Sequence, residues 1–169
     1  MSTVRDLQHV VLVGLMGSGK TTVGLLVAQR LGWPLVDNDQ ELGRRIGMTA
    51  RELTAREGLE ALHRAEAETL AGMLDRSDPA VIGAAASVVE SAEMRDLLER
   101  HYVVWLDADP EVLAARAATG SHRPHLPAAE LQAARSALYE QVAALRVDTT
   151  HLSPADAAEI VAEALTDGR

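Results

Sequence analysis

The sequence contains no cysteine and no phenylalanine, and its 169 residues include only two tryptophans and two tyrosines. Without cysteine, disulfide bonds and thiolate zinc sites are excluded. With so few aromatic residues, a core must be built from Leu, Val, Ala and Ile. Hydrophobic residues make up 47% of the chain, which is enough for one domain of ordinary size. We therefore expect a single domain over residues 1–169.

Basic residues are outnumbered by acidic ones. The sequence has 16 Lys and Arg but 25 Asp and Glu, which gives a net charge of −9. A protein that binds nucleic acid needs a basic face for phosphate contacts, so we expect no nucleic-acid partner. No apolar run reaches the length that spans a membrane, and the first residues, MSTVRDLQH, lack the pattern of a signal peptide. These absences predict a soluble cytoplasmic protein without a membrane partner, and we expect a monomer.

Short apolar runs alternate with segments of helical periodicity along the whole chain. This alternation is typical of βαβ units and predicts an α/β fold of three layers, with about five parallel strands between two layers of helices. The strands are expected at residues 9–14, 32–39, 80–86, 102–108 and 145–149. The helices are expected at residues 19–31, 47–58, 59–74, 91–100, from 109 onward, 128–145 and from 153 onward. Ligands of such sheets bind at the carboxyl ends of the strands, so residues 14–21, 37–39 and 83–87 should converge in one cleft.

The stretch GLMGSGKT, residues 14–21, matches the phosphate-binding pattern of Gly, any four residues, Gly, Lys and then Ser or Thr. A predicted strand precedes the stretch and a predicted helix follows it, which is the context that this loop requires. Lys20 would reach the β- and γ-phosphates of ATP, and the Thr21 hydroxyl would bind Mg²⁺. The alternative is an ordinary glycine-rich turn. Such a turn does not explain why a predicted strand precedes the stretch and a predicted helix follows it. The expected nucleotide-binding residues are Met16, Gly17, Ser18, Gly19, Lys20, Thr21 and Thr22.

Two aspartates end the second predicted strand, in the sequence Asp37-Asn38-Asp39. Because successive strand residues alternate between faces, the two carboxylates are expected to point the same way. Asp37 could then hold magnesium, and Asp39 could take a proton from an attacking hydroxyl. The alternative is that an aspartate here caps a helix, since Asp favours that position. The phosphate loop favours the functional interpretation.

These motifs together resemble the shikimate kinase family of P-loop kinases. GLMGSGKTTVG is similar to the family's phosphate loop, and DNDQEL is similar to its D-x-D motif. GMTARELTAREGLEALHRAEAETL resembles the two helices that follow, ATGSHRPHL the lid, and ARSALYEQVA the motif near the C-terminus. The motifs occur in the family's order over about the whole chain. The resemblance implies a three-layer P-loop kinase fold, a mobile lid at about residues 117–126, and an enzyme that uses ATP and Mg²⁺.

The resemblance also implies roles in phosphate transfer for individual residues. Lys20, Asp39 and Arg123 would be catalytic, with Asp39 as the base and Arg123 reaching the transferring phosphate from the lid. Asp37 would share the magnesium shell with Thr21. Arg123 and the proline after it lie in a segment without helical periodicity. Arg123 is therefore not explained as a solvated charge on a helix, which favours the functional role.

Three further residues match family positions around the two substrates. By the resemblance, Arg116 would lie against the adenine, Arg135 would hold the substrate carboxylate, and Glu66 would support a substrate-binding arginine. The alternative for Arg116 and Arg135 is that both are solvated charges on helix surfaces. Arg123 and Arg135 favour an acidic or strongly polar acceptor, and Asp39 favours a hydroxyl on that acceptor.

The sequence departs from the family pattern on the acceptor side. His63 stands where the family has an arginine, and an imidazole offers a carboxylate fewer donors than a guanidinium does. The family's three glycines after the third strand are replaced by Ala85, Ala86 and Ser87. Alanine adopts positive φ only at a cost of about 1–2 kcal/mol, and its methyl group keeps a ligand away from the backbone. Thr54 and Leu59 also replace a Phe and a Glu of the family.

The donor side therefore indicates Mg-ATP, whereas the acceptor side indicates a changed or weakened site. The predicted function is phosphorylation of a hydroxyl on a small polar metabolite, which we expect to be acidic. One alternative is a true shikimate kinase that tolerates these changes, and another is a nucleotide-binding protein without catalysis. The expected substrate-binding residues are Asp39, His63, Ala85, Ala86, Ser87 and Arg135.

Overall fold

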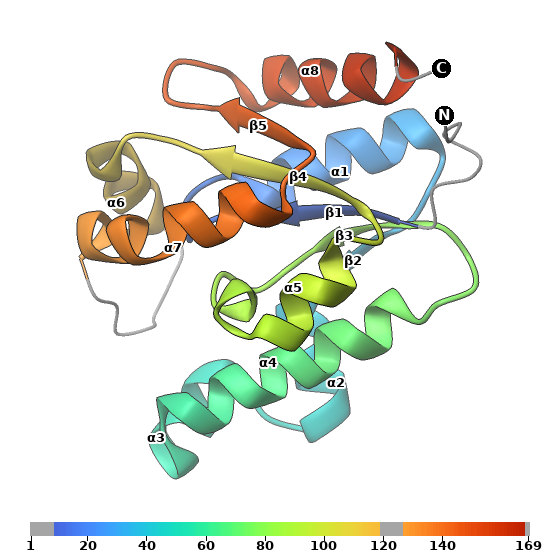
Figure 1. Ribbon diagram of the computed structural model, residues 1–169. Coiled ribbons are helices and arrows are strands. Elements are labelled where there is room, and N and C mark those ends of the chain that lie inside the picture. The colour runs from blue at the N-terminus through green and yellow to red at the C-terminus, as the bar shows by residue number, and fades with distance from the viewer. Residues whose placement is uncertain (1–8, 119–126, 168–169) are drawn as a thin grey trace.

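A five-stranded parallel sheet lies at the centre of the computed structural model, which describes residues 9–118 and 127–167 (Figure 1). The spatial order of the strands is β2-β3-β1-β4-β5, and all four pairings are parallel. The strands are β1 His9–Val13, β2 Leu35–Asp37, β3 Ala80–Gly83, β4 Tyr102–Asp107 and β5 Leu145–Asp148. The predicted α/β fold with about five parallel strands is confirmed.

Helices cover both faces of this sheet, as the ribbon in Figure 1 shows. Helices α1 and α8 pack together on one face, and α4, α5 and α7 lie on the other. The helices are α1 Lys20–Leu31, α2 Asn38–Ile46, α3 Ala50–Glu57, α4 Leu59–Leu74, α5 Ala92–Leu98, α6 Pro110–Ala118, α7 Ala128–Val142 and α8 Pro154–Asp167, with a 3₁₀ turn η1 at Val88–Glu90. None of the helices in the described ranges is long and apolar enough to cross a membrane.

Helix α2 corrects the prediction that a strand continues through residues 37–39. The strand ends at Asp37, whose side chain accepts hydrogen bonds from the backbone N–H groups of Asp39 and Gln40 and so caps the helix. The capping alternative is therefore right for Asp37, and the alternation of strand residues does not apply to Asp39. The preference of aspartate for the position before a helix favours this cap, since its carboxylate accepts from N–H groups that have no partner within the helix.

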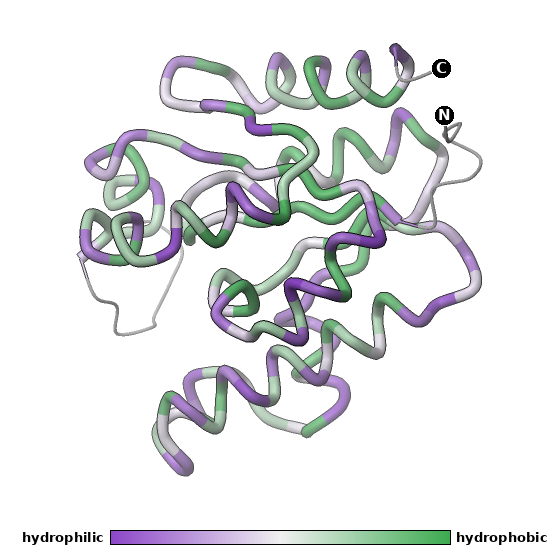
Figure 2. Tube along the Cα trace, viewed as in Figure 1, coloured by the Kyte–Doolittle hydropathy of each residue, from purple (hydrophilic) through white to green (hydrophobic). Residues whose placement is uncertain are grey.

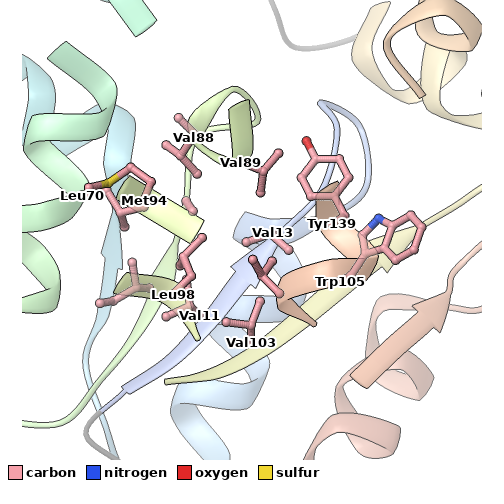
Figure 3. Close-up of a cluster of buried hydrophobic side chains, with 14 of the residues drawn as sticks. Val11, Val13, Leu70, Val88, Val89, Met94, Leu98, Val103, Trp105 and Tyr139 are labelled. Atoms are coloured by element: carbon pink, nitrogen blue, oxygen red, sulfur yellow. The ribbon is translucent and has the colours of Figure 1, made fainter. Parts of the chain in front are cut away.

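The core divides into two apolar layers, one on each face of the sheet. Figure 2 shows the hydrophobic colour concentrated along the strands and on the helix sides that face them. Figure 3 shows the larger layer, in which Val11 and Val103 of the sheet lie near Leu98. Two of the four aromatic residues lie in this layer, where the rings of Trp105 and Tyr139 stack with centroids 5.7 Å apart, whereas Trp33 and Tyr102 pack against the other layer. The core is otherwise aliphatic, as the composition predicted.

His9 is a fully buried polar residue at the start of β1. Its Nδ1 accepts a hydrogen bond from the backbone N–H of Ala80 (3.2 Å), so Nε2 carries the proton and donates to the carbonyl oxygen of Leu74 (3.1 Å). Burial lowers the pKa of His9, with a smaller opposing effect of its backbone hydrogen bonds. The neutral ring therefore ties β1, the start of β3 and the end of α4 together.

We predict that acid weakens the fold partly through His9. The folded state binds this proton less readily than the unfolded chain, in which the pKa is about 6.5. The stabilisation is therefore fully present above about pH 6.5 and is lost as the pH falls through the lower folded-state pKa. Urea unfolding at pH 7 and pH 5 should show a smaller pH effect for His9→Gln than for the wild type. Equal pH effects in the two proteins would contradict this role.

Candidate active site

The carboxyl ends of β1, β2 and β3 border a cavity of about 520 Å³, here called the loop cavity. The three segments that were predicted to converge all contribute to its lining. The lining consists of residues 16–23, 37–39 and 83–86, with Arg116, Thr149, Leu152, Ser153, Pro154 and Ala157. The predicted nucleotide-binding residues 16–22 thus share one cavity with both aspartates.

The phosphate loop between β1 and α1 depends on its glycines. Gly17 has φ +82°, and a β-carbon there would lie 2.5 Å from the carbonyl oxygen of Leu113, so no larger residue fits. The loop leads directly into α1, which begins at Lys20 after Gly19 in the left-handed conformation. A helix N-terminus reached through such a loop directs backbone N–H groups and the positive end of the helix dipole at an anion.

Lys20 is the only lysine in the sequence. Its Nζ donates to the carbonyl oxygens of Gly14 (2.7 Å) and Leu15 (3.0 Å), which holds the ammonium at the loop. Within the described ranges, the buried Ser18 hydroxyl oxygen has no hydrogen-bond partner. The donors at this loop suit the oxygens of a polyphosphate.

Asp37 and Asp39 are close enough to influence each other at the edge of the loop cavity. Burial raises the pKa of the Asp37 carboxyl, and the negative charge of Asp39 raises it further. The N–H groups of Gln40 and Asp39 and the ammonium of Lys20 act in the opposite direction. A divalent cation would favour the ionised form. Mg²⁺ typically binds through one or two carboxylates plus phosphate oxygens, so Thr21 and Asp37 fit such an ion.

Arg116 lies at the far side of the loop cavity, on α6. Its guanidinium donates to the hydroxyl and the carbonyl oxygen of Thr149, at 2.9 and 2.8 Å. These bonds hold the planar group at the cavity wall. This position differs from that of a freely solvated helix charge and is compatible with stacking against a base.

A second cavity of about 560 Å³, here called the side cavity, adjoins the first, because Met16 and Ala86 line both. Its walls come from η1 and from helices α3, α4, α6 and α7, which are labelled in Figure 1. Four of the predicted substrate-binding residues, His63, Ala86, Ser87 and Arg135, line this cavity, whereas Asp39 and Ala85 line the loop cavity. The predicted set is thus divided between two adjoining cavities.

A buried hydrogen-bond network connects the residues between the two cavities. The Asn38 side chain donates to the carbonyl oxygen of Glu66 (3.2 Å) and accepts from the N–H of Ala85 (3.1 Å). The carboxylate of Glu66 accepts a hydrogen bond from the Ser87 hydroxyl (2.6 Å). Asn38 and Glu66 are only 1% and 2% exposed, so this network is shielded from water.

The replacements of the family's glycines cause no backbone strain. No non-glycine residue in the described ranges has positive φ. Ser87 is helical at φ −79°, and the carbonyl oxygen of Ala86 accepts from the Tyr139 hydroxyl at 2.6 Å. The segment is held by side chains from α2, α4 and α7, so these residues affect a ligand by filling space and occupying hydrogen bonds.

Arg135 is 6% exposed, so the alternative that it is a solvated helix charge is wrong. Its Nε donates to Oε1 of Glu90 at 3.1 Å, and Nδ1 of His63 lies 3.6 Å from Oε2 of the same carboxylate. The predicted catalytic residue Arg123 lies outside the described residues, as does most of the predicted lid. Ala117 and Ala118 of that segment lie in α6.

Sequence reasoning missed three residues of the site: Asn38, Glu90 and Thr149. Asn38 stands between two motif aspartates, and its burial depends on a helix start that was assigned to a strand. Glu90 and Thr149 belong to no motif, and only the packing of distant segments brings them to the cavities. The sequence carried no signal for either.

A comparison with known protein families identifies the family to which this chain belongs. A family model described as "Shikimate kinase" matches residues 16–166. The chain belongs to the shikimate kinase family. It is therefore a small-molecule kinase, a phosphotransferase that resembles shikimate kinase over nearly its whole length. The family and the P-loop kinase fold that the motifs implied are confirmed.

Individual relatives agree with this assignment. The shikimate kinase of Symbiobacterium thermophilum is 41% identical over 169 residues, covering 94% of this chain and 97% of that protein. The shikimate kinase of Thermobifida fusca is 37% identical over 161 residues, covering 92% of this chain and 93% of that protein. A solved structure of the shikimate kinase from Acinetobacter baumannii in complex with shikimate has a TM-score of 0.90 and 29% identity, covering 96% of this chain and 95% of that one.

We predict that Lys20 controls nucleotide binding. Lys20→Ala should weaken binding of Mg-ATP by at least about tenfold, because it removes a charge-assisted hydrogen bond to phosphate. Isothermal titration calorimetry measures this loss, and Lys20→Arg serves as the control that keeps the charge. Since the chain has no other lysine, an amine-specific reagent should modify this side chain, and bound Mg-ATP should protect it. Equal affinity in Lys20→Ala and wild type would refute the assignment.

We also predict that Asn38→Ala destabilises the fold by about 1–3 kcal/mol, because the buried N–H of Ala85 loses its acceptor. Asp39→Asn is the matched control, since it alters the adjacent, exposed side chain. Urea unfolding should separate the two variants. A stability loss in Asp39→Asn as large as that in Asn38→Ala would show that the buried amide has no special role.

Proposed function

We propose that this kinase transfers the γ-phosphoryl group of Mg-ATP to a hydroxyl of a small hydroxylated metabolite held in the side cavity. The observation that carries the proposal is the shared wall of the two cavities. The phosphate loop and Asp39 line one cavity, and the other opens from it across Met16 and Ala86. A donor and an acceptor bound in adjoining cavities meet the geometric requirement of direct transfer.

The proposed roles follow the positions of the side chains. Lys20 would bind the phosphates, Thr21 and Asp37 would hold the magnesium, and the metal would neutralise developing phosphate charge when bound. Asp39, exposed at the loop cavity, would orient the attacking hydroxyl and accept its proton. Arg116 would contact the adenine. Arg123 would stabilise the transferring phosphate, as the family motif implies.

The class of acceptor is supported by the solved relative from Acinetobacter baumannii, which was described in complex with shikimate, a small hydroxylated acid. The identity of 41% to the relative from Symbiobacterium thermophilum also favours shikimate as a second candidate substrate for this chain. The side cavity weakens that candidate, however. His63 offers at most a single donor where the family uses an arginine, and the Ser87 hydroxyl occupies the Glu66 carboxylate.

We predict that shikimate is a poor acceptor for the wild type and that the cause lies in these residues. Replacing a bidentate arginine by a weaker donor removes about 2–3 kcal/mol. Such a loss lowers kcat/KM by about two orders of magnitude. The variant His63→Arg, Ala85→Gly, Ala86→Gly, Ser87→Gly should raise kcat/KM for shikimate, because Ser87→Gly releases Glu66 to support the new arginine.

The control variants carry either His63→Arg alone or the three glycines alone, and each should do much less, because both changes act on one bound molecule. ADP release with a series of small hydroxylated acids and sugars measures the activity. Robust turnover of shikimate by the wild type would overturn this prediction and identify shikimate as the substrate. No stimulation of ATP turnover by any acceptor would count against the proposed kinase reaction in this cavity.

A further inference from the structure

We propose that Glu90 occupies the anion position of the side cavity, so that the acceptor is uncharged where it meets Arg135. This inference rests on the proposed function and specifies the chemistry of the acceptor. Glu90 is thereby assigned as a specificity-determining residue.

Arg135 needs a counter-charge because its side chain is 7% exposed. A buried guanidinium without a partner costs several kcal/mol, and a carboxylate is the partner that its planar geometry matches. The Glu90 carboxylate supplies this partner at 3.1 Å. A carboxylate carried by an acceptor would need the same donor.

The second oxygen of the Glu90 carboxylate faces His63. Oε2 lies 3.6 Å from Nδ1 of His63, so the carboxylate lies between the two side chains that the family resemblance assigned to the substrate. Arg135 and His63, the two side chains that could bind an acidic acceptor, thus both face a carboxylate of the protein itself.

Hydrogen bonds fix the main chain at Glu90, from which its 42% exposed side chain reaches Arg135. The N–H of Glu90 donates to the carbonyl oxygen of Ser87 (3.0 Å), which closes the 3₁₀ turn. Arg95 donates to the carbonyl oxygens of Val89 (2.7 Å) and Glu90 (3.3 Å). A tethered carboxylate competes at an effective concentration on the order of millimolar or above, so a free acid must displace it.

The charges around the side cavity also disfavour an acid. Among the residues that the structure describes, Arg51 and Arg135 in its lining are matched by Glu66 and Glu90, so these four charges give the cavity no net positive charge. An acid at the Arg135 end would meet the carboxylate of Glu90. Leucines form much of the remaining lining, namely Leu15, Leu59, Leu62, Leu113 and Leu131. These features together fit a neutral hydroxylated molecule with an apolar side.

The test compares shikimate with its methyl ester, which lacks the negative charge and carries one additional methyl group. Glu90→Ala removes the carboxylate from the anion position. Glu90→Gln removes the charge with little change of volume, and it replaces the alanine variant in the test if that variant does not fold. Glu93→Gln is the matched control, because Glu93 is an exposed glutamate in the first turn of α5. Calorimetry on the ADP-loaded proteins measures binding of each probe, and ADP release with ATP measures turnover.

We expect the wild type and Glu93→Gln to bind the ester at least as tightly as the acid. In the Glu90 variants the ratio of acid to ester affinity should rise by about tenfold or more, the effect of about one charge-assisted hydrogen bond to the released Arg135. An unchanged ratio in folded Glu90 variants, including no binding of the acid at all, would overturn the inference. A raised ratio without turnover of either probe would leave this inference standing and count against the proposed function instead.

Discussion

The buried side chain of Asn38 is the contact on which the arrangement of the site depends. Its amide joins the start of α2 to α4 through the carbonyl oxygen of Glu66 and to the end of β3 through the N–H of Ala85. A parallel sheet brings the carboxyl ends of its strands to one edge but does not by itself fix the segments that follow them. The amide fixes two of these segments against each other in a place where water cannot replace it.

This contact also determines which carboxylates face which cavity. Because Asp37 caps α2 and Asn38 turns inward, Asp39 is left on the exposed side, at the loop cavity. Glu66, on the other side of the amide, is buried and bonded to Ser87. The carboxylate at the loop is therefore accessible to a ligand, whereas the carboxylate next to the side cavity is held by the protein.

The loop cavity and the side cavity differ in how closely the backbone constrains their side chains. The phosphate loop is constrained by close backbone approach, as at Gly17, where a β-carbon would collide with Leu113. No comparable constraint acts on Ala86 or Ser87, which have ordinary backbone angles and are supported by Tyr139 and Glu66. The side chains of the side cavity, the pair of Glu90 and Arg135 among them, are therefore not fixed by the backbone of the phosphate loop.

The sequence by itself determined the order of the strands and of the helices other than α2, the phosphate loop and the family. These features depend on local periodicity and on motifs whose spacing is fixed by backbone geometry. The prediction of a strand through residues 37–39 was wrong because a run ending in Asp37-Asn38-Asp39 has both strand and capping character, and capping prevailed. Only the tertiary structure decided the burial of Arg135, the inward turn of Asn38 and the position of Glu90. Each of these depends on partners 28 to 47 residues away in the chain, and no local pattern encodes such a contact.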